Sequence, residues 1–174
     1  MTFSIIFLVS IFVLNSWRRT MFTIAVIAFI TEWIAYWIHM PVLNFVSSLT
    51  NIIFFQIIVI KLIIQIAKSK IADSRVIFES INGYLMLGLL FTLWIAIAMQ
   101  YDSGSFSFQV EMPVVQDYIY FTFVTMTTLG YGDVTPLLPF ARSLAILISI
   151  SGQIYIAVII AMLVGKYASQ ESTK

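Results

Sequence analysis

The residues Thr125–Asp133, with the sequence TMTTLGYGD, have a composition suited to binding a cation through backbone oxygens. Glycines at positions 130 and 132 are separated by one tyrosine, and glycine adopts positive φ with little penalty. When every second residue has a positive φ, successive carbonyls turn to the same side. In an ordinary strand, successive residues instead point to opposite faces. A row of such carbonyls, ended by the Thr128 hydroxyl, forms oxygen cages for a dehydrated cation. Five extended residues span about 13 Å, which is room for several ions in file.

The overall composition places this segment in a membrane protein. Of the 174 residues, 61% are hydrophobic and 10% are charged, whereas soluble domains carry about 25% charged residues. The chain has no cysteine, which excludes disulfides and cysteine-based metal sites. We find neither a nucleophile–base pair nor a cluster of metal ligands, so we expect no enzyme activity and no cofactor. No basic run is long enough to predict nucleic-acid binding.

Three apolar segments come first, and we expect them to form peripheral transmembrane helices within residues 1–68. They cover residues 2–17, 20–38 and 42–67. The first is shorter than the ~17 residues that a span requires, so it either crosses the membrane or lies in the interface. Glu32 and Lys61 are ionisable residues inside these segments, and intramembrane charges are candidate functional residues. Alternatively, Lys61 reaches the membrane surface and Glu32 forms hydrogen bonds within the bundle.

Residues 69–82 form the longest polar stretch ahead of the cation-binding segment. We expect a short linker helix there, on the cytoplasmic side of the membrane. Asp73 or Ser74 can cap such a helix, because their side-chain oxygens accept hydrogen bonds from backbone amides in the first turn. A plain connecting loop is the alternative.

A second domain, residues 83–168, places two long apolar segments on either side of the cation-binding segment. The first, 81–100, and the last, 141–167, are long enough to span a membrane. The last would be about 40 Å long as a helix. Residues 117–127 are helical in character but too short to span, and residues 169–174 form a short tail.

The basic residues indicate an orientation, because they gather on the cytoplasmic side of membrane proteins. With the last apolar segment running inward, eight of the nine lysines and arginines are cytoplasmic and Arg142 alone lies outside. We therefore expect a multi-pass protein of the cell membrane, surrounded by lipid, with a cytoplasmic C-terminus. Its N-terminus is extracellular if residues 2–17 span. Carboxylates at the outer face would concentrate cations there: Asp102, Glu111, Asp117 and Asp133.

The order of these segments resembles the pore domain of the potassium-channel superfamily, from about residue 77 to 167. The selectivity filter of that family is usually written TVGYGD, and Thr128–Asp133 reads TLGYGD here, with Leu129 in place of the commonest valine. The alternative, a glycine-rich turn between two membrane helices, suits a shorter match better. The resemblance implies an all-α integral membrane protein. It would be a tetrameric pore of outer helix, re-entrant pore helix, filter and inner helix, plus two or three peripheral transmembrane helices.

The resemblance also implies a ligand and a set of ligating residues. The permeant ion would be K⁺, bound by carbonyl oxygens that replace its hydration shell. A ring of carbonyls needs four copies of one filter, so the expected partner is the chain itself, in a homotetramer. The ligating residues would be Thr128, Leu129, Gly130, Tyr131 and Gly132.

The same resemblance assigns supporting roles around the filter. Tyr120 stands where the family has the first of two pore-helix tryptophans, so its hydroxyl is expected to bond to Asp133. Thr127 is expected to support the filter as well. Gly152 stands at the gating hinge of the inner helix and Gly165 is similarly placed, although close packing against a neighbouring helix is the alternative for both. The peripheral segments contain no ladder of basic residues, so we expect no voltage sensor.

Three functions are consistent with these observations. The leading hypothesis is a potassium-selective channel that conducts passively. A non-selective cation channel would have the same fold, but Tyr131 argues against it, because related non-selective filters differ at that position. A non-conducting, channel-like membrane subunit would be favoured by a degraded filter, and this filter is intact.

Overall fold

The computed structural model describes residues 26, 30, 41–69 and 73–171 of the chain. The predicted segment 2–17, nearly all of the segment 20–38 and Glu32 therefore lie outside the described residues. The chain divides into two compact units, residues 1–62 and residues 63–174.

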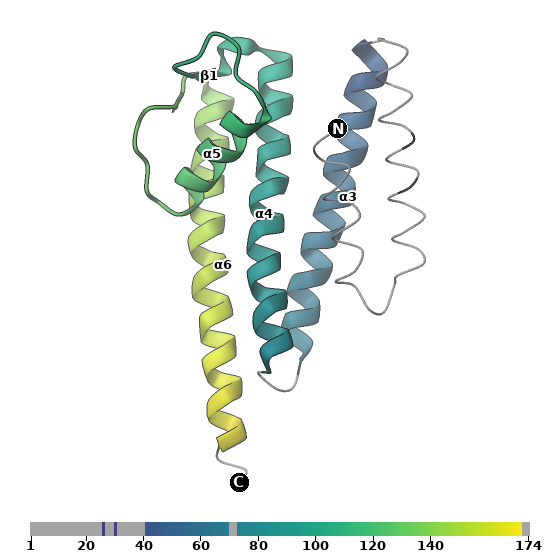
Figure 1. Ribbon diagram of the computed structural model, residues 1–174, viewed down its shortest axis with the longest axis vertical. Helices are drawn as coiled ribbons and strands as arrows, with labels where there is room; N and C mark the ends of the chain where they lie inside the picture. The colour runs from purple at the N-terminus through teal and green to yellow at the C-terminus, as the bar shows by residue number, and fades with distance from the viewer. Residues whose placement is uncertain (1–25, 27–29, 31–40, 70–72, 172–174) are drawn as a thin grey trace. The chain divides into compact units, whose positions relative to one another are not determined.

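Helices make up most of the described chain (Figure 1). They are α3 (Pro41–Lys68), α4 (Ser74–Tyr101), α5 (Val115–Met126) and α6 (Pro139–Glu171). The connections contain the 3₁₀-helix η1 (Ser103–Ser105) and two short strands, β1 (Phe106–Ser107) and β2 (Thr135–Pro136). Within the described ranges, α3, α4 and α6 contain segments long and apolar enough to cross a membrane. The prediction of a mainly helical membrane protein is confirmed to this extent.

The helix α3 covers the predicted segment 42–67 and extends it by one residue at each end. In the first unit its buried residues recur at intervals of three or four, as in a helix with one covered face. The fully buried apolar side chains there are Phe54, Phe55, Ile58 and Leu62, whereas Ile53, Ile57 and Ile60 are exposed.

The helix α4 starts at the cap that the sequence predicted, but it continues past residue 82, where the sequence predicted the end of a linker. Asp73 is the N-cap, and its side chain accepts a hydrogen bond from Val76 N at 3.0 Å. The helix then continues without a break to Tyr101, so the prediction of a separate linker helix within residues 69–82 is wrong. No proline interrupts this stretch, and the buried side chains of Val76 and Ser80 continue the covered face of the longer helix.

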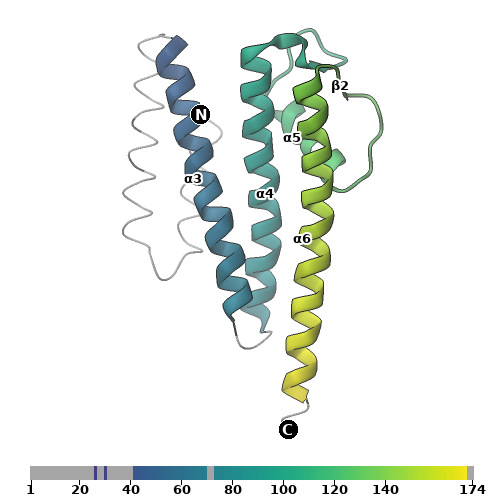
Figure 2. The ribbon, with the colours of Figure 1, turned by 180° about the vertical axis from the view of Figure 1, so that it is seen from behind.

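In the second unit, α4 and α6 lie side by side and run in opposite directions (Figures 1 and 2). The short helix α5 lies across one end of this pair and contacts both helices. The predicted re-entrant segment, 117–127, corresponds to α5, whose 12 residues are about 18 Å long. The predicted inner helix, 141–167, corresponds to α6, which extends through most of the predicted tail to Glu171.

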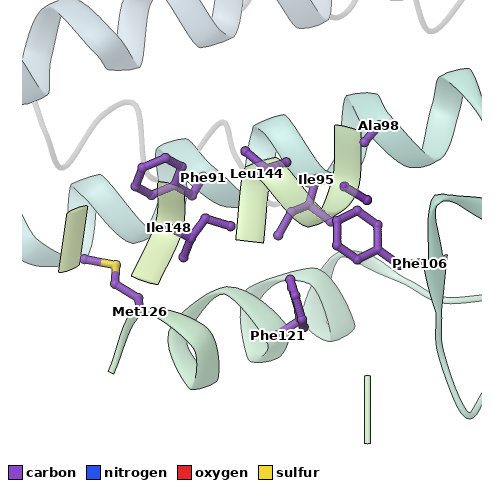
Figure 3. Close-up of a cluster of buried hydrophobic side chains, with 9 residues drawn as sticks. Phe91, Ile95, Ala98, Phe106, Phe121, Met126, Leu144 and Ile148 are labelled. Atoms are coloured by element: carbon purple, nitrogen blue, oxygen red, sulfur yellow. The ribbon is translucent and has the colours of Figure 1, made fainter. Parts of the chain in front are cut away.

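An apolar core joins the three helices at the end that contains α5 (Figure 3). Phe121 on α5 packs edge-on against Phe106 of the connecting loop, with ring centroids 5.1 Å apart. Lipid is as apolar as these side chains, so close van der Waals packing rather than escape from water would hold such helices together in a membrane. The buried members of the cluster are Phe91, Ile95, Ala98, Phe106, Phe121, Met126, Ala141, Leu144 and Ile148.

Small and hydroxylated residues let these helices approach closely. A Cβ at Gly88 of α4 would lie 2.6 Å from Cε1 of Phe123, so the ring of α5 would have to shift if a larger residue stood there. One turn further along α4, the fully buried Thr92 hydroxyl lies 3.2 Å from the Thr122 hydroxyl. It shares its single proton between that oxygen and Gly88 O, which lies at 3.0 Å. Thr122 in turn donates to Tyr118 O at 2.7 Å, which leaves its own oxygen available as an acceptor. The sequence alone did not identify these contacts.

The loop after α4 is fastened to the chain that leads into α6. The strands β1 and β2 pair antiparallel, with Phe106 opposite Pro136 and Ser107 opposite Thr135. Ser105 O also accepts a hydrogen bond from Leu137 N at 2.9 Å. These bonds fix the far end of the connection that follows α5.

The cap at Asp73 gives a testable prediction for the start of α4. Replacing Asp73 with alanine removes the acceptor for Val76 N and should cost about 1 kcal/mol of stability in the first turn. Asp73→Asn keeps a capping oxygen and is the matched control. Hydrogen exchange of the peptide beginning at Ser74 should be faster in the alanine variant only. Equal exchange in both variants would show that α4 does not depend on this cap.

Candidate functional site

The stretch from Thr127 to Asp133 follows directly on α5, and its backbone changes hand at every second residue. Thr128, Gly130 and Gly132 have φ angles of 62°, 57° and 80°. Within the described ranges, no other residue has a positive φ. The glycines were predicted to permit this conformation, whereas nothing in the sequence predicted it for Thr128.

The end of α5 explains the positive φ of Thr128. Thr127 is the C-cap with helical angles, so Thr128 occupies the next position, where helices commonly turn left-handed. Thr128 N donates to Thr125 O and Leu129 N donates to Val124 O, both at 3.0 Å. This pair of hydrogen bonds defines a Schellman motif. Glycine usually occupies that position, and a β-branched residue there is strained by about 1–3 kcal/mol.

The carbonyl oxygens of residues 128–132 lack a hydrogen-bond donor among the residues that the structure describes. Gly130 N donates to Val124 O at 3.2 Å, so the first amides of the stretch fold back onto α5. Within the described residues, no carbonyl oxygen from 128 to 132 accepts a hydrogen bond. A Cβ at Gly130 or Gly132 would meet no atom within 4 Å. The stretch therefore offers a row of unpaired oxygens beside open space, and oxygen is the ligand that hard cations prefer.

A short hydrogen bond holds the far end of the stretch to α5. Tyr120 Oη donates to Asp133 Oδ2 at 2.6 Å, a distance typical of a hydroxyl on a carboxylate. The structure thus brings together the pair that the motif predicted. This hydrogen bond, followed by desolvation and the charge of Asp133, raises the pKa of Tyr120 from 10.0 to about 12. The part of the stabilisation that depends on the Tyr120 proton is therefore fully present as the pH approaches 10 from below and is lost as the pH rises through about 12.

Thr127 and Phe121 differ from Tyr120 in what they contact. Thr127, predicted to support the filter, donates its hydroxyl to Phe123 O of α5 at 2.7 Å and so binds its own helix end. Phe121, next to Tyr120, is 5% exposed and belongs to the apolar core. Only Tyr120, of these three residues, reaches across to the residues that follow the stretch.

The two glycines considered as hinges lie in different surroundings. A Cβ at Gly152 would collide with Met126 O and lie 2.6 Å from Met126 Cγ, at the last turn of α5. Gln153 Nε2 donates to the same carbonyl at 3.4 Å. Gly152 is therefore required by close packing, the alternative that the sequence left open. A Cβ at Gly165 would meet no atom within 4 Å. Bending of α6 at either residue remains a prediction.

Charge is distributed unevenly between the two ends of the second unit. Asp117 lies in the first turn of α5 and accepts a hydrogen bond from Val114 N at 2.7 Å, which suits a carboxylate at a helix N-terminus. The end that contains α5 and its loops carries the carboxylates Asp102, Glu111, Asp117 and Asp133 and one basic residue, Arg142. The opposite end carries the basic residues Lys68, Arg75 and Lys166 together with the acidic residues Asp73, Glu79 and Glu171.

Comparison with known proteins gives one family match, which lies within this unit. Residues 84–168 match a family model described as an ion channel. The matched range begins in α4, includes α5 and the stretch 127–133, and ends in α6. The match supports an ion-channel pore domain in this part of the chain, and thus a membrane transport protein rather than an enzyme. No curated protein and no solved structure matches the chain.

The hydrogen bond between Tyr120 and Asp133 can be tested by removing one hydroxyl. Tyr120→Phe should make ion current decay several-fold faster during sustained opening, because the end of the stretch loses its link to α5. Tyr118→Phe is the matched control, since the Tyr118 hydroxyl makes only a 3.4 Å contact with Pro113 O. The measurement is the time constant of current decay in reconstituted protein. Equal decay in the two variants would show that this bond does not hold the stretch.

The contact between Gly152 and Met126 predicts a cost for one methyl group. Gly152→Ala should lower the free energy of unfolding by about 1–3 kcal/mol, because the backbone at the end of α5 must shift. Gly165→Ala adds the same methyl where there is open space, so it should be neutral or stabilising by up to ~1 kcal/mol. Thermal unfolding in detergent compares the two. Equal stability would mean that α5 and α6 are not in contact at Gly152.

Proposed function

We propose that the chain is the subunit of a homotetrameric potassium channel that conducts K⁺ passively. The observation that supports this most is the row of unpaired carbonyl oxygens from 128 to 132, produced by alternating positive φ. Four such rows around one axis would surround an ion with eight oxygens at each level between successive carbonyls. The Thr128 hydroxyl would add the innermost ring of ligands.

Selectivity follows from what these oxygens replace. A cation enters the row only if the carbonyls compensate for the loss of its water shell. The strained left-handed Thr128 and the amides bound to Val124 O hold the inner end of the row in place. The bond between Tyr120 and Asp133 holds the outer end. A row fixed at both ends favours the ion whose size suits the cage, and we assign that ion as K⁺.

The C-terminal end of α5 would also stabilise a bound K⁺ electrostatically. The stretch begins at the C-terminal end of this helix, where backbone carbonyls create partial negative charge. A cation waiting at the inner end of the row would therefore be stabilised by four helix ends. The carboxylates at the end of the unit that holds α5 would concentrate cations around the outer mouth.

The exposed apolar surface of a single chain supports assembly. Only 22% of the most apolar window of α6 is buried, against 50% for α4. Leu129 is 55% exposed and Tyr131 is 67% exposed, on a stretch whose oxygens would face the axis. Further copies would cover these side chains, and lipid would cover the remaining surface of a multi-pass protein. The charge difference between the two ends favours a cytoplasmic C-terminus.

Flux from liposomes separates this function from its alternatives. We expect vesicles loaded with K⁺ to release it through the reconstituted protein, with strong preference over Na⁺. Ba²⁺ should block this flux, because it is close to K⁺ in size but carries twice the charge. Protein-free vesicles are the control. Comparable K⁺ and Na⁺ flux would favour a non-selective cation channel, and no flux from an assembled tetramer would favour a non-conducting subunit.

A further inference from the structure

The helix α6 is held by different contacts along its length. It is 33 residues long, about 50 Å. The half before Gly152 packs in the apolar core with α4 and α5. Among the described residues, the half after Gly152 packs in a smaller second cluster, formed by its own Tyr155 and Ile159 with Ile66 of α3 and Val76 of α4. Side-chain hydrogen bonds supplement this cluster.

The first of these hydrogen bonds joins α6 to α4. Tyr155 Oη donates to Ser80 O at 2.8 Å, and both residues are buried. Gly83 makes room for this phenol, because a Cβ there would collide with the Tyr155 hydroxyl and lie 3.3 Å from Cζ. The part of α6 just after Gly152 is therefore fixed to α4.

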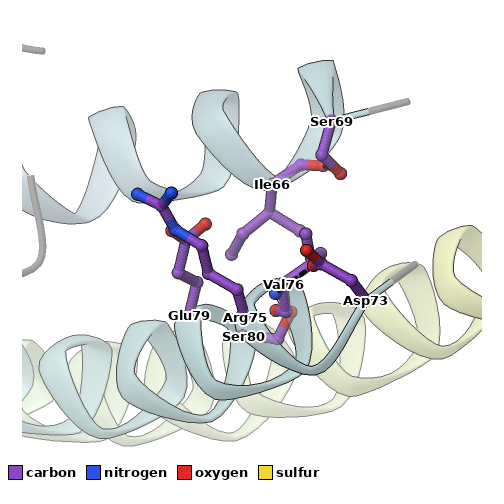
Figure 4. A network of polar contacts seen from close by, with 7 residues as sticks. All are labelled: Ile66, Ser69, Asp73, Arg75, Val76, Glu79 and Ser80. Atoms are coloured by element: carbon purple, nitrogen blue, oxygen red, sulfur yellow. Dashed lines mark hydrogen bonds and ion pairs between the residues drawn. The ribbon is translucent and has the colours of Figure 1, made fainter. Parts of the chain in front are cut away.

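The second contact joins the end of α6 to the last turn of α3. Lys166 Nζ donates to Ile66 O at 2.6 Å and to Ser69 Oγ at 2.8 Å. Ile66 and Ser69 lie beside the start of α4, where Asp73 caps that helix (Figure 4). The ammonium group thus lies at the C-terminal end of α3, where the helix dipole favours a positive charge. Ile66 O also accepts a hydrogen bond from Ser69 Oγ at 2.9 Å.

The surroundings of Lys166 differ from those of a lysine that merely extends to the membrane surface. Such a side chain directs its ammonium group to water. The Lys166 side chain is instead half-buried and contacts two acceptors of another helix, about 100 residues away in sequence. Among the described residues, no carboxylate lies within ion-pair distance of Lys166. Its partners are helix-terminal oxygens, which are fixed to α3.

We propose that Lys166 is a positioning residue that fastens the inner end of α6 to the C-terminal turn of α3. This role rests on the proposed function, in which α6 lines the inner mouth of the pore. The second half of α6 can change its position only if this contact breaks or if the end of α3 moves with it. The equilibrium between conformations of the inner mouth therefore depends on the contact between Lys166 and α3.

The test uses the full chain, reconstituted as a channel, with three single substitutions. Lys166→Met keeps the length of the side chain and removes the ammonium group. Lys166→Arg keeps a positive donor and should behave like the unmodified channel. Lys68→Met is the matched control, because it removes an exposed charge from the same turn of α3. Loss of one helix-end contact predicts about a 3- to 10-fold change in the ratio of open to closed channels in Lys166→Met alone. The ratio of K⁺ to Na⁺ permeability should not change.

A distance measurement reports the contact independently of conduction. The chain has no cysteine, so Ala67→Cys and Ala168→Cys introduce the only two sites for spin labels, at exposed positions on α3 and α6. Labelled chains diluted with unlabelled chains give the distance within one subunit. Lys166→Met should broaden this distance distribution, whereas Lys166→Arg should restore it. A milder variant, Ser69→Ala, removes one acceptor and should show a smaller effect if Lys166→Met fails to assemble.

Unchanged distances and an unchanged open probability in Lys166→Met would overturn the proposal. If the Lys166→Met channel still conducts in that case, the proposed role of Lys166 is rejected and the proposed function is retained. If the unmodified protein is assembled and conducts no ions, the proposed function fails and the gating role fails with it. In that case the label distances still show whether Lys166 fastens α6 to α3.

Discussion

The geometry of the site depends on how α5 ends. Two amides, of Thr128 and Leu129, return to carbonyls of the last helical turn, and this termination forces Thr128 into the left-handed region. The change of hand begins there and is continued by Gly130 and Gly132. The early amides bond to α5, and within the described part of the chain no donor reaches the oxygens of residues 128–132. A helix end that is common in proteins thus starts the backbone conformation that the proposed ion path requires.

The rest of the second unit holds that helix end in place. Gly88 on α4 and Gly152 on α6 admit Phe123 and Met126 of α5 at distances that would have to change if larger residues stood there. Small residues allow such close packing inside a membrane. Close van der Waals contact matters there, because lipid is as apolar as the side chains and the hydrophobic effect does not drive the helices together. The hydroxyl pair of Thr92 and Thr122 adds a polar contact between α4 and α5. A rigid support is what a fixed row of oxygens needs, because relaxed oxygens would adapt to several ions.

Local patterns explain what could be predicted from the sequence. Apolar length identified α3, α4 and α6, and the glycine spacing identified the stretch after α5. The cap at Asp73 was identified too, but a cap marks only where a helix begins, so the separate linker helix was a wrong inference. The positive φ of Thr128 follows from the residue at which α5 ends, which its sequence did not indicate. The collision at Gly152 and the bond from Lys166 to Ile66 depend on contacts that form only in the fold. No local pattern encodes them, because their partners are chosen by packing.

The position of bound ions in the assembled protein tests the proposed ion path most directly. Thallium(I) resembles K⁺ in size and scatters X-rays anomalously, so crystals of the protein grown in thallium would reveal its sites. We expect a row of anomalous peaks on the symmetry axis of a tetramer, between the carbonyls of residues 128 and 132. Peaks at carboxylates alone, with none along this row, would contradict the proposed ion path.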